Sequence, residues 1–320
     1  MAAATDTSTA AAHRALREGA GVLDRSELGK LALTGAQAKE LLNGQVSNDV
    51  EALEPGTGCY ATLLTNKGKM LGDLRILDTG TELLLLTERV SLQALFDQLR
   101  RGAIGWQADL HKRTLQQGLV SVIGPRARDV AGAGELPAAE HANRRAELGG
   151  APVLLVATDL GVDVVCAADD TARVRGALLA AGAVEVDEVA AEVARVESGR
   201  PRYGIDTDAT TIPQEAGLNE RAVSFTKGCY VGQETVARLH WRGKPNRQLR
   251  GLRLSAPAPT GAPLRLGERE VGRLGSVAVS PRFGPIALAI VRREVAVGDT
   301  LAVGDGAVRA EVVELPFAAG

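Results

Sequence analysis

Residues 59–77 read CYATLLTNKGKMLGDLRIL. Two apolar runs flank Asn66, Lys67 and Gly68, which is the pattern of two antiparallel strands joined by a tight turn. The stretch therefore predicts a β-hairpin. Because a hairpin pairs its strands locally, it favours α+β layers over a doubly wound parallel sheet.

Irregularly alternating strands and helices are expected on both sides of this hairpin. Before it, a short helical stretch around His13 to Glu18 leads to the strand GKLALTG, and AQAKELLNG predicts a helix closed by Gly44. After it, ELLLLTE predicts a strand and SLQALFDQLRR a helix that Ser91 can cap. The strands LVSVIG, PVLLVA and VDVVCA and the helix TARVRGALLAAG follow. Neither GxGxxG nor GxxxxGK[ST] is present in a suitable context, so nucleotide binding by those motifs is not expected.

The sequence pattern changes from Leu249 onward. Prolines at positions 257, 259 and 263 punctuate a loop, and short strands with turns follow it. Val308, Ala310 and Val312 alternate with polar neighbours, as in strands with one buried face. This part of the chain predicts a separate small β-barrel or sandwich.

Composition excludes several classes of protein. Hydrophobic residues make up 45% of the 320 residues but aromatics only 3%, so the cores must be aliphatic, and 37 Lys and Arg against 39 Asp and Glu give no whole-chain sign of nucleic-acid binding. Three widely spaced cysteines predict neither a disulfide framework nor a structural zinc site and fit a reducing compartment. No apolar run is long enough for a membrane span and the N-terminus lacks the pattern of a signal peptide, so we expect a cytoplasmic protein.

The segment DEVAAEVARVESGRPRYG at residues 187–204 carries a candidate ligand-binding acid. Asp187 is a plausible N-cap, and Glu197 falls at the edge of the apolar stripe of the helix that follows. A half-buried carboxylate there can accept two parallel N–H bonds from a ligand edge. A salt bridge to a nearby arginine is the structural alternative.

A second candidate is Cys229 in FTKGCYVGQE at residues 225–234. We expect a helix to begin near Tyr230, so the helix dipole and Lys227 would both favour a thiolate that acts as a nucleophile or metal ligand. The alternative is a thiol buried as a small hydrophobe. Only His240 lies near in sequence, so a Cys-His catalytic pair has weak support.

Two further features point to ligands. Eight basic residues lie between Glu220 and Arg253, which suggests an anionic partner or else a solvated face and linker, and Trp241 among them keeps RNA contact open. Asp73 lies in an otherwise apolar strand. Its carboxyl group can point inward to a ligand amine or outward to solvent.

Together these stretches resemble one family. KGCYVGQE at residues 227–234 resembles the signature of the folate-binding YgfZ family, relatives of the aminomethyltransferase (T-protein) of the glycine cleavage system. Other stretches resemble further blocks of the T-protein family: GVLDRSELGKLALTG, NDVEALEPGTGCYATLLTNKGKMLGDL, RVESGRPRYGID and GRLGSVAVSP. The resemblance spans nearly the whole chain.

The resemblance implies an α+β, GcvT-like three-domain fold. Residues 14–50 plus 115–245 would form a discontinuous folate-binding domain, residues 51–114 an inserted α+β domain and residues 246–320 a C-terminal β-barrel domain.

The resemblance also implies a site and a function. Glu197 would bind the pterin edge of tetrahydrofolate or a one-carbon derivative, with Tyr203, Lys227 and Tyr230 as further cofactor-binding residues. Aminomethyltransferases carry paired aspartates where this chain has Gly72 and Asp73, which puts aminomethyl transfer in doubt. We therefore expect an accessory protein that supports iron–sulfur cluster assembly or repair and, through iron–sulfur enzymes, tRNA modification, with Cys229 and Asp73 as the reactive groups and no resident metal. The alternative is a folate-dependent aminomethyltransferase or demethylase.

Overall fold

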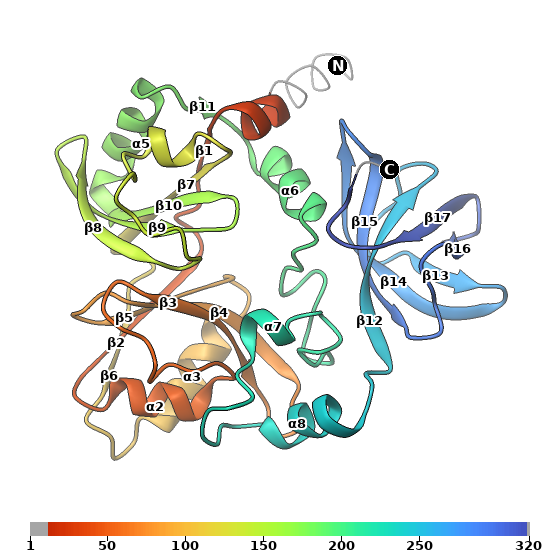
Figure 1. The fold of residues 1–320 in the computed structure, drawn as a ribbon, viewed down its shortest axis with the longest axis horizontal. Coiled ribbons are helices and arrows are strands. Elements are labelled where there is room, and N and C mark those ends of the chain that lie inside the picture. Colours follow the sequence, from red (N-terminus) through yellow and green to blue (C-terminus); the bar gives the residue numbers. More distant parts are fainter. Residues whose placement is uncertain (1–11, 319–320) are drawn as a thin grey trace.

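Two open β-sheets and one closed barrel make up the computed structural model, which describes residues 12–318 (Figure 1). The first sheet has the order β11-β1-β7-β10-β9-β8. Its strands are β1 (Gly21–Asp24), β7 (Gln117–Ile123), β8 (Asn143–Leu148), β9 (Ala151–Ala157), β10 (Gly161–Ala167) and β11 (Val184–Glu185).

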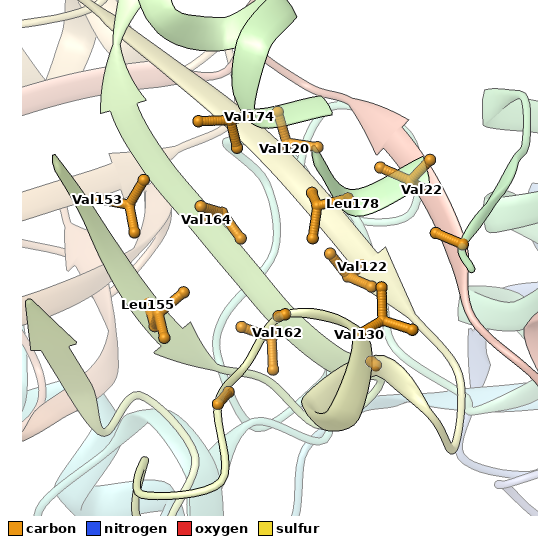
Figure 2. Packing of buried hydrophobic residues seen from close by; sticks show 14 of the residues in the cluster. Val22, Val120, Val122, Val130, Val153, Leu155, Val162, Val164, Val174 and Leu178 are labelled. Atoms are coloured by element: carbon orange, nitrogen blue, oxygen red, sulfur yellow. The ribbon is translucent and has the colours of Figure 1, made fainter. Parts of the chain in front are cut away.

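One face of the first sheet is covered by α4 (Ala127–Val130) and α5 (Thr171–Ala180), and a 3₁₀ turn at Ala168–Asp170 leads into α5. Alternate strand residues point to this face, because successive side chains in a strand point to opposite sides. Figure 2 shows Val120 and Val164 of the sheet beside Val174 and Leu178 of α5. This aliphatic core fits the low aromatic content of the chain.

The second sheet has the order β3-β4-β5-β2-β6. Its strands are β2 (Gly29–Thr34), β3 (Gly58–Leu64), β4 (Met70–Asp78), β5 (Leu83–Thr87) and β6 (Asp109–Lys112), and α2 (Ala38–Gln45) and α3 (Leu92–Gly102) cover one face. The hairpin predicted at residues 59–77 is confirmed: β3 and β4 pair antiparallel, and Gly68 has a φ of 72° in the turn.

The predicted barrel is also confirmed. It closes in the order β12-β15-β14-β13-β16-β17, and its strands are β12 (Arg247–Leu254), β13 (Pro263–Leu266), β14 (Arg269–Ser280), β15 (Gly284–Arg292), β16 (Thr300–Val303) and β17 (Val308–Val313). A connection containing α6 (Glu188–Glu197), α7 (Asn219–Ala222) and α8 (Gln233–Arg242) runs from the first sheet past the second sheet to the barrel (Figure 1).

Strand pairing crosses one of the predicted domain limits. β2 lies in the predicted segment 14–50, yet it pairs with β5 and β6 of the predicted segment 51–114. The physical reason is a shared core, since Leu31 and Leu33 pack in the same apolar cluster as Leu85. The limits 14–50 plus 115–245, 51–114 and 246–320 remain predictions as domain boundaries.

The uncovered faces of the two sheets face each other. Leu77, Leu84 and Leu86 of the second sheet pack against residues of the first sheet, namely Leu119, Leu154, Val156 and Val165. By strand alternation, Tyr60, Asp73 and Arg75 share this face of the second sheet, while Ser121 and Asp163 share that of the first. The same two faces therefore supply both an apolar contact and a polar lining beyond it.

Local signals at helix ends were predicted with mixed success. The helix at residues 12–18 and the Asp187 cap are confirmed, since the Asp187 carboxylate accepts a hydrogen bond from the amide of Ala190 at 2.9 Å. Gly44 does not close α2, which runs to Gln45. Ser91 does not cap α3 either, because its hydroxyl donates to the carbonyl of Glu88 and bonds the hydroxyl of Thr87.

In the described range 12–318, no helix combines the length and the apolar character that a membrane crossing needs.

Candidate functional site

A cavity of about 200 Å³ lies where the facing sheets carry polar side chains. The second sheet contributes Tyr60, Asp73 and Arg75 to its wall, and Glu88 follows directly after β5. The first sheet contributes Ser121 and Asp163. Loops add His141, Arg202 and Tyr203 to the lining, and α7 adds Arg221.

Asp73 is the buried acid of this cavity, with 6% of its surface exposed. Burial raises the pKa of its carboxyl group to about 6, and the negative charge of Glu88 adds to that rise. A hydrogen bond from the Tyr60 hydroxyl and the charge of Arg221 act in the opposite direction. A carboxyl group tuned in this way can exchange a proton near neutral pH, as a general acid or base must.

Gly72 faces away from the cavity. A Cβ atom built on Gly72 would lie 2.7 Å from Cβ of Ser91 and 3.0 Å from Cδ1 of Leu95, both beside or within α3. Because residues 72 and 73 are consecutive in β4, their side chains point to opposite faces of the sheet. Of this pair of residues, the one that carries a carboxyl group therefore faces the cavity.

A belt of ion pairs borders the cavity beside Glu88. Arg202 reaches Glu88 at 3.2 Å, Glu188 at 2.7 Å and Glu192 at 3.2 Å. These carboxylates raise the pKa of the Arg202 guanidinium, which stays charged. Arg25 also pairs with Glu188, at 3.2 Å. The belt places fixed positive charge next to the acids of the cavity.

His141 and Arg221 also line the cavity. His141 has a φ of 69° and is 4% exposed, and burial lowers the pKa of its imidazole to about 3, so the ring is neutral at physiological pH. Its ring stacks on Tyr60 with centroids 6.4 Å apart. The Arg221 guanidinium lies 5.1 Å from the centroid of Tyr60 and pairs with Glu140. These contacts hold Tyr60 against Asp73.

An ion pair between the two sheets forms the rest of the polar wall of the cavity. Arg75 of the second sheet contacts Asp163 of the first at 2.6 Å, and the Ser121 hydroxyl donates to the same carboxylate at 2.6 Å. Such a buried pair fixes the relative position of two polar surfaces that would otherwise need water.

Glu197 does not line the cavity. It is the last residue of α6, and its carboxylate accepts a hydrogen bond from the Ser280 hydroxyl at 2.5 Å and lies 3.0 Å from Nε2 of His13. Arg17 approaches its other oxygen at 3.7 Å. The side chain therefore joins α6 to the helix at residues 12–18 and to the barrel. Its predicted contact with a pterin remains a prediction.

The two predicted tyrosines lie in one apolar cluster but differ in access to the cavity. Tyr203 lines the cavity, and its hydroxyl donates to the carbonyl of Met70 at 3.3 Å. Tyr230 is buried among Leu64, Met70 and Val236, and burial raises its pKa to about 12. Tyr230 therefore anchors its loop, and it does not belong to the cavity lining.

Lys227 is held by backbone carbonyls. The ammonium group of Lys227 donates to the carbonyls of Asn43, Val46 and Asn48 at 2.5, 3.0 and 2.8 Å, and burial lowers its pKa to about 8. Its position beside those carbonyls ties the KGCY loop to the end of α2.

The thiol of Cys229 is exposed. The prediction that a helix begins near Tyr230 is wrong, because α8 begins at Gln233 after Gly232 in a left-handed conformation with a φ of 84°. A Cβ atom on Gly232 would lie 2.4 Å from the carbonyl oxygen of Thr65, so the packing of this turn on the β3–β4 hairpin delays the helix. Cys229 therefore precedes the first turn of α8. The sequence had predicted that it would lie at the helix start, where the helix dipole acts.

Much of the basic stretch between Glu220 and Arg253 is engaged within the protein. Arg221 pairs with Glu140, Arg247 with Glu215 and Arg250 with Glu314. The exposed members include Arg238, Arg242 and Lys244, which lie on or just after α8 near Trp241, itself 70% exposed. RNA contact at this end of α8 remains a prediction.

Sequence pattern did not reveal Tyr60, Glu88, His141 or Arg202 as cavity residues. Tyr60 and Glu88 lie within the segments predicted as strands, so their phase relative to Asp73 was the one usable signal. His141 lies in a loop that no periodic pattern marks.

Two facing sheets with an acid-lined cavity between them, joined to a closed barrel, define an aminomethyltransferase-like fold. The crystal structure of the glycine cleavage system aminomethyltransferase T from Bartonella henselae has this fold, with a TM-score of 0.86 and 23% identity over 97% of this chain and 89% of that chain. The predicted GcvT-like α+β fold class is confirmed.

The chain belongs to the glycine cleavage T-protein family. Residues 2–227 match the model of the GCVT N-terminal domain, and residues 247–318 match that of the glycine cleavage T-protein C-terminal barrel domain. The aminomethyltransferase of Saccharopolyspora erythraea is 31% identical over 333 residues, which cover 97% of this chain and 90% of that protein. A putative chloroplastic transferase of Arabidopsis thaliana is 26% identical over 318 residues, covering 95% and 73% of the two chains. Membership of the YgfZ branch remains a prediction.

Proposed function

We propose that the protein binds a reduced folate, tetrahydrofolate or a one-carbon derivative of it, in the cavity between the sheets. The observation that carries this proposal is the buried carboxyl group of Asp73 at the cavity wall. A pterin offers a 2-amino group and an adjacent ring N–H, and a carboxylate accepts such paired donors. Family membership supports the same ligand, because the relatives named above include aminomethyltransferases.

We further propose that the folate-bound protein acts as an accessory protein for iron–sulfur cluster assembly or repair. Its partners would be iron–sulfur enzymes or assembly proteins, and tRNA modification would depend on it through those enzymes. Support comes from the exposed thiol of Cys229, which a protein partner can reach. Tyr230 anchors the same loop in an apolar cluster that also includes Tyr60 and Tyr203 of the cavity lining.

Calorimetric titration of tetrahydrofolate into three proteins tests the folate site, and complementation of cells that lack the gene tests the accessory role. We expect Asp73→Asn to weaken binding by about tenfold or more, since a hydrogen bond to a charged acceptor contributes roughly 1.5–3 kcal/mol. Cys229→Ser should bind as the unmodified protein does, yet fail to restore iron–sulfur enzyme activity in cells that lack the gene. Restoration by Cys229→Ser would refute the thiol's role. No binding to the unmodified protein would refute the folate site.

A folate-dependent aminomethyltransferase or demethylase is the second candidate. The orientation of residues 72 and 73 favours it, because the carboxyl group that faces the cavity is retained and can exchange a proton with a folate amine. Turnover of an aminomethyl or N-methyl donor by the purified protein, abolished in Asp73→Asn, would support a transferase. Inactivity with every such donor, in a protein that binds tetrahydrofolate, would leave the accessory role.

A further inference from the structure

We propose that His141 and Arg221 form a separate binding position in the wall of the cavity, which takes a small neutral group with a hydrogen-bond donor beside an acceptor, namely a lactam or a primary amide. The position lies beside the ring of Tyr60. The inference goes beyond the proposed function, because it requires neither a folate nor any particular residue to hold the pterin.

Two buried polar atoms at this wall lack partners. Nδ1 of His141 and Nε of Arg221 are both buried, and neither has a hydrogen-bond partner within residues 12–318. His141 is only 4% exposed, and both side chains line the cavity. Because buried polar atoms in proteins are nearly always hydrogen-bonded, two unsatisfied atoms at a cavity wall indicate a place for a bound group.

Shared contacts place the two side chains in one corner. Both reach Oε1 of Glu140, since Nε2 of His141 lies 3.6 Å from that oxygen and Nη2 of Arg221 donates to it. Both also contact the ring of Tyr60: the imidazole stacks with its centroid 6.4 Å away, and the guanidinium carbon lies 5.1 Å from the centroid. One small group in this corner can therefore meet both unsatisfied atoms.

The hydrogen-bonding roles of the two atoms differ. Burial and the charges of Arg75 and Arg221 lower the pKa of His141 to about 3, so the ring is neutral and carries a single N–H. The Glu140 carboxylate favours the proton on Nε2, which leaves Nδ1 as an acceptor. Nε of Arg221 can only donate. The bound group must therefore donate one hydrogen bond and accept another.

The charges around the corner are already balanced, which favours a neutral ligand group. Each guanidinium whose charge acts on the ring of His141 has an acid beside it: Arg221 and Glu140, Arg75 and Asp163 at 2.6 Å, Arg200 and Asp159 at 2.7 Å. An anion would meet the Glu140 carboxylate and the lone pair of Nδ1, and a cation would meet the guanidinium groups. A lactam or primary amide presents N–H and C=O side by side without a charge.

The fold holds His141 in place before a ligand arrives. Its φ of 69° makes it the one non-glycine residue with a positive φ in the described part of the chain. Its amide donates to the carbonyl of Ala157 at 2.9 Å, and a Cβ atom on Gly58 would lie 2.9 Å from its own Cβ, so glycine at that position allows the close approach. Backbone strain persists where packing fixes it, and it is frequent at ligand-binding sites.

The test is nitrogen-15 NMR of the full chain labelled at its four histidines and titrated with the lactam 2-pyrrolidinone. His141→Asn assigns the resonances of His141 by their loss, since asparagine tolerates a positive φ. We expect Nδ1 to resonate as an unprotonated nitrogen in the free protein. It should move upfield when it accepts the N–H of the lactam, with a roughly millimolar dissociation constant.

N-methyl-2-pyrrolidinone is the matched ligand, because it keeps the carbonyl but has no N–H. It should bind about fivefold or more weakly and leave the Nδ1 resonance in place. A protonated Nδ1 in the free protein would overturn the inference. Equal shifts with both ligands, or no shift with either, would overturn it too, and the absence of any shift would mean that the position takes water only.

A second arm replaces the donor. Arg221→Lys removes the Nε–H group but keeps a positive charge beside Glu140, and it should weaken 2-pyrrolidinone binding about fivefold or more. Arg250→Lys is the control: Arg250 also has a buried Nε without a partner in the described range, pairs with Glu314 at 3.8 Å, and has a side chain 23% exposed against 24% for Arg221.

Arg250 lies in β12, outside the cavity lining, so its replacement should leave binding unchanged. Equal binding by Arg221→Lys and the unmodified protein would overturn the inference. If Arg221→Lys does not fold, the two lactams still decide with the unmodified protein.

The same titration in saturating tetrahydrofolate identifies the source of the bound group. A shift of Nδ1 by tetrahydrofolate itself, with loss of 2-pyrrolidinone binding, would assign the position to an amide of the folate. Binding of 2-pyrrolidinone to the folate-loaded protein would assign it to a second ligand. Both results support the position. If the protein does not bind tetrahydrofolate, the proposed function fails, while the lactam titration still decides this inference.

Discussion

Replacing Asp73 with asparagine should make the protein more stable at neutral pH while removing its function. Asp73 is buried, and its pKa rises from an ordinary 3.8 to about 6 on folding. Ionising it in the folded state therefore costs more than in the unfolded chain. At about 1.4 kcal/mol per pKa unit, the cost at pH 7 is about 3 kcal/mol. Asparagine carries no charge and keeps an oxygen that can accept the hydrogen bond from Tyr60.

The sign of the pH dependence follows from the direction of the shift. Because the folded-state pKa is the higher one, the native protein holds more protons than the unfolded chain between about pH 4 and pH 6, and its stability falls as pH rises through that window. The cost is negligible below about pH 3, reaches about 1.6 kcal/mol at pH 5 and levels off near 3 kcal/mol above pH 6 to 7. The gain from Asp73→Asn should follow the same curve.

Urea unfolding at pH 5, 6 and 7 measures this gain, with Asp109→Asn as the control. Asp109 is an exposed aspartate of β6 in the same sheet, so its replacement should change stability by no more than about 0.5 kcal/mol. A gain from Asp73→Asn that does not grow between pH 5 and pH 7 would refute the assignment of Asp73 as a strained, buried acid. A loss of stability at pH 7 would show that the carboxylate is satisfied in the folded protein.

Four further predictions concern other residues of the site and its surroundings. Gly72→Asp restores the paired aspartates expected of aminomethyltransferases. In urea unfolding it should destabilise the fold by about 1–3 kcal/mol, because the new side chain meets Ser91 and Leu95. Calorimetry should find no gain in folate affinity. Iodoacetamide at pH 7.5 should label Cys229 before the other two cysteines, as mass spectrometry can show, because Cys166 is buried and burial raises the pKa of Cys59 to about 12. Equal labelling of all three cysteines would contradict the described exposures. Lys227→Met leaves three carbonyls without their donor and should lower the unfolding free energy by about 3 kcal/mol, whereas an unchanged midpoint would mean that the loop does not depend on this contact. Glu197→Gln should lower the unfolding free energy by about 1–3 kcal/mol, because it weakens the contacts with His13 and Ser280, and it should leave folate affinity intact. A fall in affinity far beyond that of a surface change would instead support contact with the pterin.

Local pattern was sufficient for features that depend on neighbours in sequence. The hairpin at residues 59–77, the Asp187 cap and the barrel follow from alternation and turn chemistry, and the structure confirms them. Features that depend on distant segments were not accessible. Nothing within GKLALTG shows that β2 pairs with β5 and β6, and nothing near Glu197 shows that His13 and Ser280 occupy its carboxylate.

The position of α8 illustrates the same limit at closer range. The apolar spacing after Tyr230 allowed an earlier helix start, but the carbonyl of Thr65 from the β3–β4 hairpin lies against Gly232 and keeps that residue left-handed. The consequence is chemical as well as geometric. Cys229 is left exposed ahead of the first turn of α8, so the predicted position at the helix N-terminus is not found.

The chemistry of the cavity and the packing of the two sheets depend on a single strand phase. Leu77, Leu84 and Leu86 point to the first sheet, and the residues that continue their alternation are Asp73 and Glu88. A slip of β4 by one residue would turn Asp73 towards α3 and present Gly72 and Leu74 to the cavity, but it would also take Leu77 out of the contact between the sheets. The aliphatic contact therefore selects the register that brings two acids to one wall, at a cost in stability that the Asp73→Asn variant measures.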